Sequence, residues 1–389
     1  MKLSLSWIKD FVNIPEDMDM KQLAYDLTMD TVEVEDVEYL ADRFDHMVVG
    51  VIEDIEPHPN ADKLRVCKVD IGDGEIKDIV CGGINLEKGM RVAVSCPGAI
   101  VRWHGEGEPV EIKKSKLRGV ASYGMICASD EIGLGDLFPA SQEAEILDLS
   151  AFDVPAGTTL ADALDLNDVL LEIDNKSMTN RPDLWGHYGI AREIAALYNL
   201  PLAEIKPFDT DVQSDFNVEI ADPDRCPRYI GVEMSGVNVK EAPYQMQNRI
   251  WKVGMRPINA LVDITNYVML ATGNPTHAFD ADNISNHIVV RHAAENEKLL
   301  LLNDKELSLC TDDLVITDSE GPVALAGVMG GAKDSILPKT ERVILEVANF
   351  EAAGIRRTAL RYDNRTEASS RYEKAIDPER CDQALALSM

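Results

Sequence analysis

The stretch HPNADKLRVCKVDIGDGE, residues 58–75, decides the fold of the first part of the chain. Its middle alternates apolar with charged side chains, in the order Cys67, Lys68, Val69, Asp70, Ile71. A period of two is typical of a half-buried β-strand, and the Gly-Asp-Gly turn at residues 72–74 ends it. Further short apolar runs lie at residues 51–55 and 92–96. Short strands with turn signals between them predict a small barrel or sandwich from about residue 47 to 149.

The segments on either side of this barrel read as helical or mixed. Residues 1–39 look small and helical, and we expect a packing element without chemistry. Residues 151–210 begin as a linker and end in a helix with an apolar face, and they could pack with residues 1–39. Beyond them, helices that open at Pro243 and Pro257 are followed by short strands.

We therefore predict a multidomain α+β chain. Its parts are a small helical N-terminal segment, a β-barrel, a connector and an α+β domain, at residues 1–39, 40–150, 151–210 and 211–389. A hydrophobic fraction of 45% and a charged fraction of 27% are those of ordinary globular proteins. No apolar run approaches the roughly 18 residues of a membrane span, and the N-terminus lacks the pattern of a signal peptide. We expect a cytoplasmic protein without membrane contact.

Two features of composition limit the possible ligands. The seven cysteines are scattered, odd in number and without a C-x-x-C pair, so we expect reduced, buried thiols and no metal site. The formal net charge is −30, whereas a free-standing nucleic-acid binder usually carries a basic face. Any contact with RNA must then be local, with a partner supplying the main basic surface.

Three stretches in the barrel region carry a family resemblance. They are HPNADKLRVCKVDIGDGE (58–75), IVCGGINLEKGMRVAVSCPGA (79–99) and KKSKLRGVASYGMICASDEIGLG (113–135). Together they resemble the tRNA-binding OB-fold of bacterial phenylalanyl-tRNA synthetase beta chains, and OB-folds bind single strands or RNA bends along one face. The natural phosphate contacts are Lys113, Lys114, Lys116 and Arg118. A solvated strand face is an equally good explanation of this basic cluster.

The remainder of the chain resembles the editing domain of the same family. The matching stretches are LEIDNKSMTNRPDLWGHYGIAREIAALY (171–198), MRPINALVDITNYVMLATGNPTHAFD (255–280), LAGVMGG (325–331), VILEVANF (343–350) and RTEASSRYEKAIDP (365–378). Glu367 departs from the family pattern, in which aspartate is more usual. Chains of this family continue through a catalytic-like domain and an anticodon-binding domain. The sequence is therefore identified as the N-terminal portion of such a chain.

The resemblance implies a function for this portion. It would bind tRNA(Phe) and hydrolyse mischarged tyrosyl-tRNA(Phe), while the alpha chain aminoacylates within a heterotetramer of two alpha and two beta chains. ATP and Mg²⁺ would serve the whole synthetase, and no cofactor is expected in this portion; neither a Walker A loop nor a Rossmann glycine pattern occurs here. Two alternatives stay open: a tRNA-binding module with an inactive editing pocket, and a structural part that holds the alpha chain.

The resemblance also implies an editing site. Glu346 would accept a hydrogen bond from the phenol of tyrosine, because a pocket shaped for phenylalanine rejects a mere added hydroxyl poorly. Gly330 and Ala368 would keep the wall low, and Arg256 and Pro275 would complete the substrate-binding set. The catalytic set, near the ester, the amino group or the attacking water, would be His277, Thr366, Thr265 and Asn266.

Bland explanations compete at several of these positions. A lone histidine on a loop is more often structural, so we favour His277 as an orienting group, with hydrolysis assisted by the terminal hydroxyls of the tRNA. The Asn-Arg-Pro-Asp turn at residues 180–183 could bind a ligand, but a turn that leads into a helix is more common. The arginines of residues 356–371 could guide the tRNA end, and we slightly favour surface salt bridges with neighbouring acids.

Overall fold

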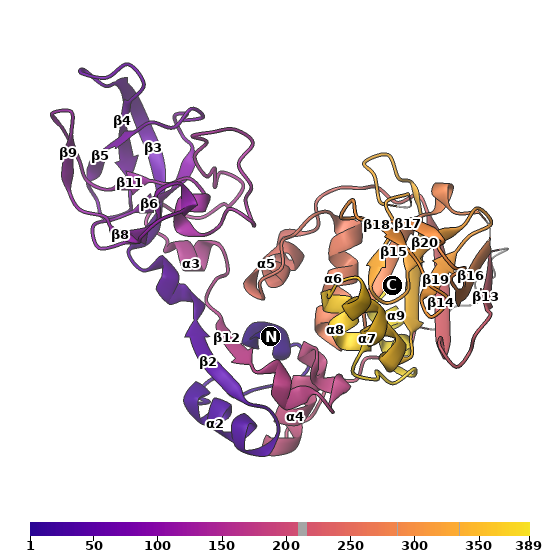
Figure 1. The fold of residues 1–389 in the computed structure, drawn as a ribbon. Helices are drawn as coiled ribbons and strands as arrows, with labels where there is room; N and C mark the ends of the chain where they lie inside the picture. The colour runs from indigo at the N-terminus through magenta and orange to yellow at the C-terminus, as the bar shows by residue number, and fades with distance from the viewer. Residues whose placement is uncertain (209–215, 286, 334) are drawn as a thin grey trace. The chain divides into compact units, whose positions relative to one another are not determined.

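The computed structural model describes residues 1–208, 216–285, 287–333 and 335–389 (Figure 1). The described residues form two compact units. One is Glu38–Leu170, and the other combines Met1–Val37 with Leu171–Met389. The mixture of helices and several β-sheets confirms the predicted multidomain α+β class.

The unit Glu38–Leu170 is built around an antiparallel sheet. Its strands, in sheet order, are β11 (Met125–Ile126), β6 (Arg91–Ser95), β3 (Met47–Pro57), β4 (Arg65–Asp70) and β5 (Ile76–Cys81). The two edge strands β11 and β5 also contact each other, so the sheet curls into a nearly closed barrel, as predicted. Cys67 and Val69 point into its core with their side chains fully covered, in agreement with the period of two.

Shorter elements surround this barrel. They are η1 (Leu40–Phe44), β7 (Ile100–Val101), η2 (Trp103–Gly105), β8 (Val110–Glu111), β9 (Ser115–Leu117), β10 (Val120–Ser122), η3 (Asp130–Ile132) and α3 (Leu160–Ala163). Strands β7 and β8 pair with each other, and β9 pairs with β10 in a hairpin.

The second unit includes a small lobe in which the N-terminal segment of the chain packs with the connector that follows the barrel. Its elements are β1 (Lys2–Ser4), α1 (Leu5–Ile8), α2 (Met20–Asp30), β2 (Val34–Tyr39), β12 (Val169–Ile173), η4 (Asn175–Met178), η5 (Pro182–Leu184) and α4 (His187–Tyr198). Strands β1, β12 and β2 form one sheet in that order. The N-terminal amine also donates to the carbonyl of Ile173 at 2.7 Å, so the N-terminal segment packs with the connector.

The larger part of the second unit contains two main sheets. The first has the order β14 (Arg228–Ser235), β22 (Arg342–Asn349), β15 (Thr276–Asp280). The second has the order β13 (Asn217–Ile220), β16 (His287–His292), β19 (Leu314–Thr317), β20 (Pro322–Leu325), β21 (Met329–Gly330). Between β16 and β19 in the chain, β17 (Lys298–Leu300) and β18 (Glu306–Ser308) form a hairpin.

The helices of this part are α5 (Tyr244–Lys252), α6 (Ala260–Thr272), η6 (Ala281–Asn283), α7 (Ala352–Arg361), α8 (Glu367–Tyr372) and α9 (Arg380–Ser388). Helix α6 begins three residues after Pro257, because the side chain of Asn259 accepts from the amides of Leu261 and Val262 and caps the helix there. It ends at Gly273, which takes a left-handed conformation with φ of 78°.

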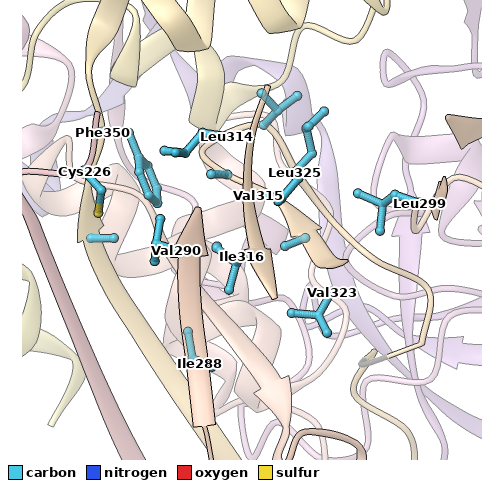
Figure 2. Packing of buried hydrophobic residues seen from close by; sticks show 14 of the residues in the cluster. Cys226, Ile288, Val290, Leu299, Leu314, Val315, Ile316, Val323, Leu325 and Phe350 are labelled. Atoms are coloured by element: carbon cyan, nitrogen blue, oxygen red, sulfur yellow. The ribbon is translucent and has the colours of Figure 1, made fainter. Parts of the chain in front are cut away.

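The main core lies between the two sheets. Figure 2 shows Ile288, Val290, Val315 and Ile316 from the second sheet gathered with Phe350, which follows β22. Strand β22 contributes its alternate residues Ile344 and Ala348 to this core. Its intervening residues, Leu345 and Val347, face the opposite way and pack with helices α6 and α9. Strand β22 is therefore covered on both faces, and a strand buried in this way seldom carries a carboxylate such as that of Glu346.

The connector is fixed tightly to the larger part of the unit. A Cβ atom on Gly186 would lie only 2.5 Å from the amide nitrogen of Gly273, so these two backbones touch. The buried Arg371 donates from Nε to the carbonyl of Trp185 at 3.0 Å. Asp183 pairs with Arg181 at 2.7 Å inside the Asn-Arg-Pro-Asp turn. The turn leads into α4, and its half-buried charged side chains pair with each other.

Among the described residues, every helix is too short or too polar to span a membrane. Within the same residues, no group of three or more His, Cys, Asp or Glu side chains is arranged to hold a metal ion. The cysteines are free thiols, and Cys96 and Cys310 are only partly covered whereas the others are buried.

Candidate functional site

Glu346 lies in the middle of β22 with its side chain directed between the two sheets. It alternates with Ile344 and Ala348, which belong to the main core, so it shares their face of the strand. The residue is 5% exposed. Burial raises the pKa of this carboxyl to about 7, and a hydrogen bond from Tyr229 offsets part of that rise. The predicted reader of the substrate is thus a buried carboxylate that titrates near neutral pH.

The partner of Glu346 is a tyrosine on the neighbouring strand. Tyr229 on β14 donates its hydroxyl to Oε2 of Glu346 at 2.8 Å. The register pairs Tyr229 with Ala348 and Gly231 with Glu346, which places Tyr229 and Glu346 on one face. The carboxylate is therefore held from one side by a single strong donor.

His277 lies opposite Glu346 on the other neighbouring strand. The register of β15 with β22 pairs these two residues directly. Burial lowers the pKa of His277 to about 4, so its imidazole is neutral at physiological pH. Gly330 lies so close that an added Cβ would be 2.8 Å from both Cε1 and Nε2 of the ring. Glycine at this position is required by the close approach of β21 to the histidine.

These groups line one small cavity of about 70 Å³, well below the roughly 300–1,000 Å³ of a typical small-molecule site. The predicted residues that line it are Pro275, His277, Gly330, Glu346 and Ala368. Its other walls are Thr276, Ile316, Ala324, Leu325, Gly327, Val328, Met329 and Tyr372. The structure thus brings together five predicted residues around a mainly apolar cavity with a carboxylate on its wall.

The other predicted residues do not line this pocket. Thr366 caps α8 and donates its hydroxyl to the carbonyl of Val328, a residue of the pocket wall, at 2.8 Å. Thr265 donates to the carbonyl of Val262 within α6 at 2.7 Å, and its own carbonyl accepts from Thr276 at 3.4 Å. The Thr366 hydroxyl and the Thr265 carbonyl thus each contact a residue of the cavity wall. Neither Asn266 on α6 nor the exposed Arg256 lines the pocket.

Two tyrosines of the site were not predicted from the sequence: Tyr372, which lines the cavity, and Tyr229, which lies behind Glu346 and does not line it. Tyr229 holds the carboxylate, and Tyr372 shares its hydroxyl hydrogen between the carbonyls of Pro275 and Ala348, each at 3.1 Å. Both are aromatic residues in apolar surroundings, a pattern that favours core packing. The pairing that makes Tyr229 part of the site joins residues 117 positions apart, and no local pattern indicates it.

The predicted phosphate-binding residues gather on the β9–β10 hairpin of the barrel unit. Leu117 pairs with Val120 across a two-residue turn in which Arg118 and Gly119 both have positive φ, 46° and 94°. The 58–75 stretch holds this turn: Asn60 donates its amide to Nδ1 of His58, and Nε2 of His58 lies 3.0 Å from the carbonyl of Leu117. An acceptor at Nδ1 leaves the proton on Nε2, so His58 donates to the turn.

The basic side chains of this hairpin are exposed and differ in their partners. Lys113 forms an ion pair with Glu111 at 3.1 Å. Lys114 lies over the ring of Tyr123, with 4.9 Å from Nζ to the ring centre. Lys114, Lys116 and Tyr123 line one side of an open hollow that also includes Asp78. The arrangement presents cations beside an aromatic ring, a combination suited to nucleic acid.

The arginines of residues 356–371 form mainly salt bridges. Arg357 and Arg361 both pair with Asp312, at 3.2 and 3.0 Å. Arg365 pairs with Glu373 at 2.5 Å. The surface-pairing interpretation therefore holds for these residues, although Asp312 is distant in the chain and is not one of the neighbouring acids.

Comparisons with known proteins identify both regions. Residues 47–158 match the family described as "Putative tRNA binding domain" and residues 225–388 match the family described as "B3/4 domain". The chain is 41% identical, over 99% of its length, to the phenylalanine–tRNA ligase beta subunit of Oceanobacillus iheyensis, of which it covers 47%. It is 41% identical, over 97% of its length, to the subunit of the same name from Pectobacterium atrosepticum, of which it covers 46%. These matches confirm the resemblance.

The chain spans about half the length of the curated relatives it matches. Among solved structures, an N-terminal fragment of the phenylalanyl-tRNA synthetase beta-subunit from Pyrococcus horikoshii aligns with a TM-score of 0.29 and 20% identity. That alignment covers 47% of this chain and 56% of the fragment, and a likeness this weak supports no inference about the site.

Proposed function

The chain is related over almost its whole length to phenylalanine–tRNA ligase beta subunits, and we propose that it is the tRNA-binding and proofreading part of such a subunit. In this proposal it binds tRNA(Phe) and hydrolyses tyrosine from tRNA(Phe) charged in error. Aminoacylation, with ATP and Mg²⁺, takes place in the alpha chain of a cytoplasmic heterotetramer. The observation that carries the proposal is the buried carboxylate of Glu346 on the wall of an otherwise mainly apolar pocket.

The pocket has the chemistry to select tyrosine over phenylalanine. A phenol hydroxyl would donate to the second oxygen of the carboxylate, whereas a phenylalanine ring would cover that oxygen and leave it unpaired. A site that demands a hydroxyl discriminates by far larger factors than one that must reject it. Gly330, Ala368 and the apolar residues of β20 border this small cavity, which would widen to admit the ring.

Hydrolysis at this pocket would depend on positioning. A neutral His277 can orient a water molecule or the terminal ribose through hydrogen bonds but carries no positive charge above pH 5. Thr366 and Thr265 donate to backbone carbonyls and support the walls. In this proposal the pocket holds the ester, the attacking water and the terminal hydroxyls of the tRNA in line. Such positioning accelerates ester hydrolysis without a nucleophile from the protein.

The barrel unit would supply a local contact with tRNA. The chain carries a net charge of −30, so long-range attraction of a polyanion is not available to it alone. The β9–β10 hairpin offers exposed cations on a turn held by His58, and an acidic chain needs such a fixed and local contact. In the complete enzyme the alpha chain would share the binding of tRNA.

Deacylation by the purified chain tests the proposal. Tyrosyl-tRNA(Phe) and phenylalanyl-tRNA(Phe) are incubated with the chain, with a Glu346→Ala variant and with buffer. We expect selective release of tyrosine that the variant loses. The same assay is repeated with the alpha chain and a full-length beta subunit carrying the same substitution. Release of both amino acids at equal rates would contradict the proposal. So would the absence of release above buffer both with the chain alone and with the complete enzyme, and the chain would then be a binding or structural module.

A further inference from the structure

The selectivity of the pocket requires a carboxylate whose free oxygen points at the substrate. Glu346 has rotatable bonds along its side chain, and a buried carboxylate can turn toward any nearby donor. In the structure Oε2 is taken by the hydroxyl of Tyr229 at 2.8 Å. That contact leaves Oε1 as the oxygen that can accept a hydrogen bond from a ligand in the pocket.

We propose that Tyr229 is the positioning residue that sets tyrosine selectivity, by holding Oε2 of Glu346 so that Oε1 receives the phenol hydroxyl of the substrate. The proposal rests on the proposed function of the same pocket. Tyr229 acts through Glu346. It is buried, and it reaches the carboxylate from the neighbouring strand β14, whose register with β22 places both side chains on one face.

The same contact decides where a proton can bind. A hydroxyl that donates to Oε2 disfavours protonation there, so a proton added to the carboxyl occupies Oε1, where the phenol hydrogen would otherwise lie. Tyrosine and the proton therefore compete for one oxygen. Selectivity falls as the pH decreases through the pKa of Glu346, and loss of the Tyr229 hydrogen bond moves that fall to higher pH.

The titration of Glu346 can be isolated from that of its neighbours. The ionisable groups that surround it are Tyr229, His277, Tyr372, Cys226 and Cys381. Burial lowers the pKa of the histidine to about 4 and raises the pKa values of both tyrosines and both thiols above their ordinary values. Among these described groups, only the carboxyl changes charge between pH 6 and 8.5.

The test compares Tyr229→Phe with Tyr372→Phe. Each substitution removes one buried phenol hydroxyl from the surroundings of the pocket, but only the first removes a hydrogen bond to Glu346. The measured quantity is the ratio of kcat/KM for tyrosyl-tRNA(Phe) to that for phenylalanyl-tRNA(Phe), from pH 6 to 8.5. A hydrogen bond to a charged group corresponds to a shift of about one to two pH units.

We expect Tyr229→Phe to lower the ratio by about tenfold or more at pH 7, with its midpoint moved up by that shift and partial recovery at pH 8.5. Tyr372→Phe should keep the wild-type midpoint. A Tyr229→Phe profile with the wild-type midpoint would overturn the proposal. A decrease of the ratio that is equal in both variants at every pH would also overturn the proposal, because Tyr229 would then contribute only packing.

A binding measurement separates this proposal from the proposed function. The probes are tyrosinamide and phenylalaninamide, titrated into wild-type chain and both variants over the same pH range. If the chain fails to hydrolyse either tRNA but prefers tyrosinamide, with a midpoint that moves in Tyr229→Phe only, the positioning role stands and the hydrolytic function falls. A chain that prefers neither probe at any pH overturns both. In a Glu346→Gln background, Tyr229→Phe should leave the pH profile unchanged.

Discussion

Replacing Glu346 by glutamine should stabilise the protein while removing its selectivity. Burial raises the pKa of the carboxyl from 4.5 to about 7 in the folded chain. The folded state thus binds the proton more tightly than the unfolded state, so ionisation opposes folding. The penalty is absent below about pH 4.5, grows through the interval to pH 7 and is complete above it. At about 1.36 kcal/mol for each pKa unit, it reaches roughly 3 kcal/mol at pH 8.

Glutamine has the same shape and does not titrate, so Glu346→Gln should recover most of this free energy. Urea denaturation at pH 5 and pH 8 measures it, as the difference in free energy of unfolding between variant and wild type. We expect little difference at pH 5 and a gain of up to about 3 kcal/mol at pH 8. Selective tyrosine release should be lost, because the amide that faces the pocket donates where the carboxylate accepted. An equal effect of the substitution at both pH values would refute the reasoning.

Three further substitutions have defined outcomes. Gly330→Ala places a Cβ 2.8 Å from the His277 ring, so we expect a loss of about 1–3 kcal/mol of stability by denaturation and a block of tyrosyl-tRNA deacylation. Lys116→Ala should weaken tRNA binding and reduce the slope of log affinity against log salt by about 1 in filter-binding titrations. Arg371→Met leaves the Trp185 carbonyl without its donor, and we expect roughly 1–3 kcal/mol of destabilisation in urea denaturation. 

Each of these substitutions has a matched control in the chain. Gly231→Ala adds a Cβ whose nearest atom is 3.4 Å away, an ordinary contact, and should fold normally. Lys113→Ala removes a cation that already pairs with Glu111, so its effect on the salt slope should be smaller than that of Lys116→Ala. Arg365→Met removes an exposed cation from Glu373, which keeps its ion pair with Lys374, and should cost less than about 1 kcal/mol. Equal effects in a variant and its control would contradict the assigned contact.

Local patterns predicted the elements of this chain better than its contacts. The alternation around Cys67 and Val69 gave a strand of the barrel. The role of Glu346 came only from the family resemblance, because a glutamate on a strand more often points to water. The start of α6 was misplaced, because the cap at Asn259 overrides the preference of proline for a first turn. Thr366 also begins α8 as its capping residue, a structural role that the Thr-x-x-Ser spacing could have indicated.

The register of the β14–β22–β15 sheet lay beyond sequence reasoning. It places Tyr229 and His277 on either side of Glu346, and these pairings join residues more than sixty positions apart. A shift of this register by one residue would turn the Glu346 side chain toward helices α6 and α9, and the carboxylate would no longer face the cavity. The site therefore depends on pairings that only the folded chain establishes.

The two proposed activities can be separated by experiment because their residues lie in different units. Lys116 and its hairpin belong to Glu38–Leu170, whereas Tyr229 and Glu346 belong to the other unit. A hairpin variant should change the affinity for both aminoacyl-tRNAs equally and leave the tyrosine-to-phenylalanine ratio of kcat/KM at its wild-type value. A Tyr229 variant should change that ratio and its pH dependence and leave the salt slope intact. If a hairpin substitution altered the ratio, discrimination would depend on how tRNA is held, and the carboxylate alone would no longer account for it.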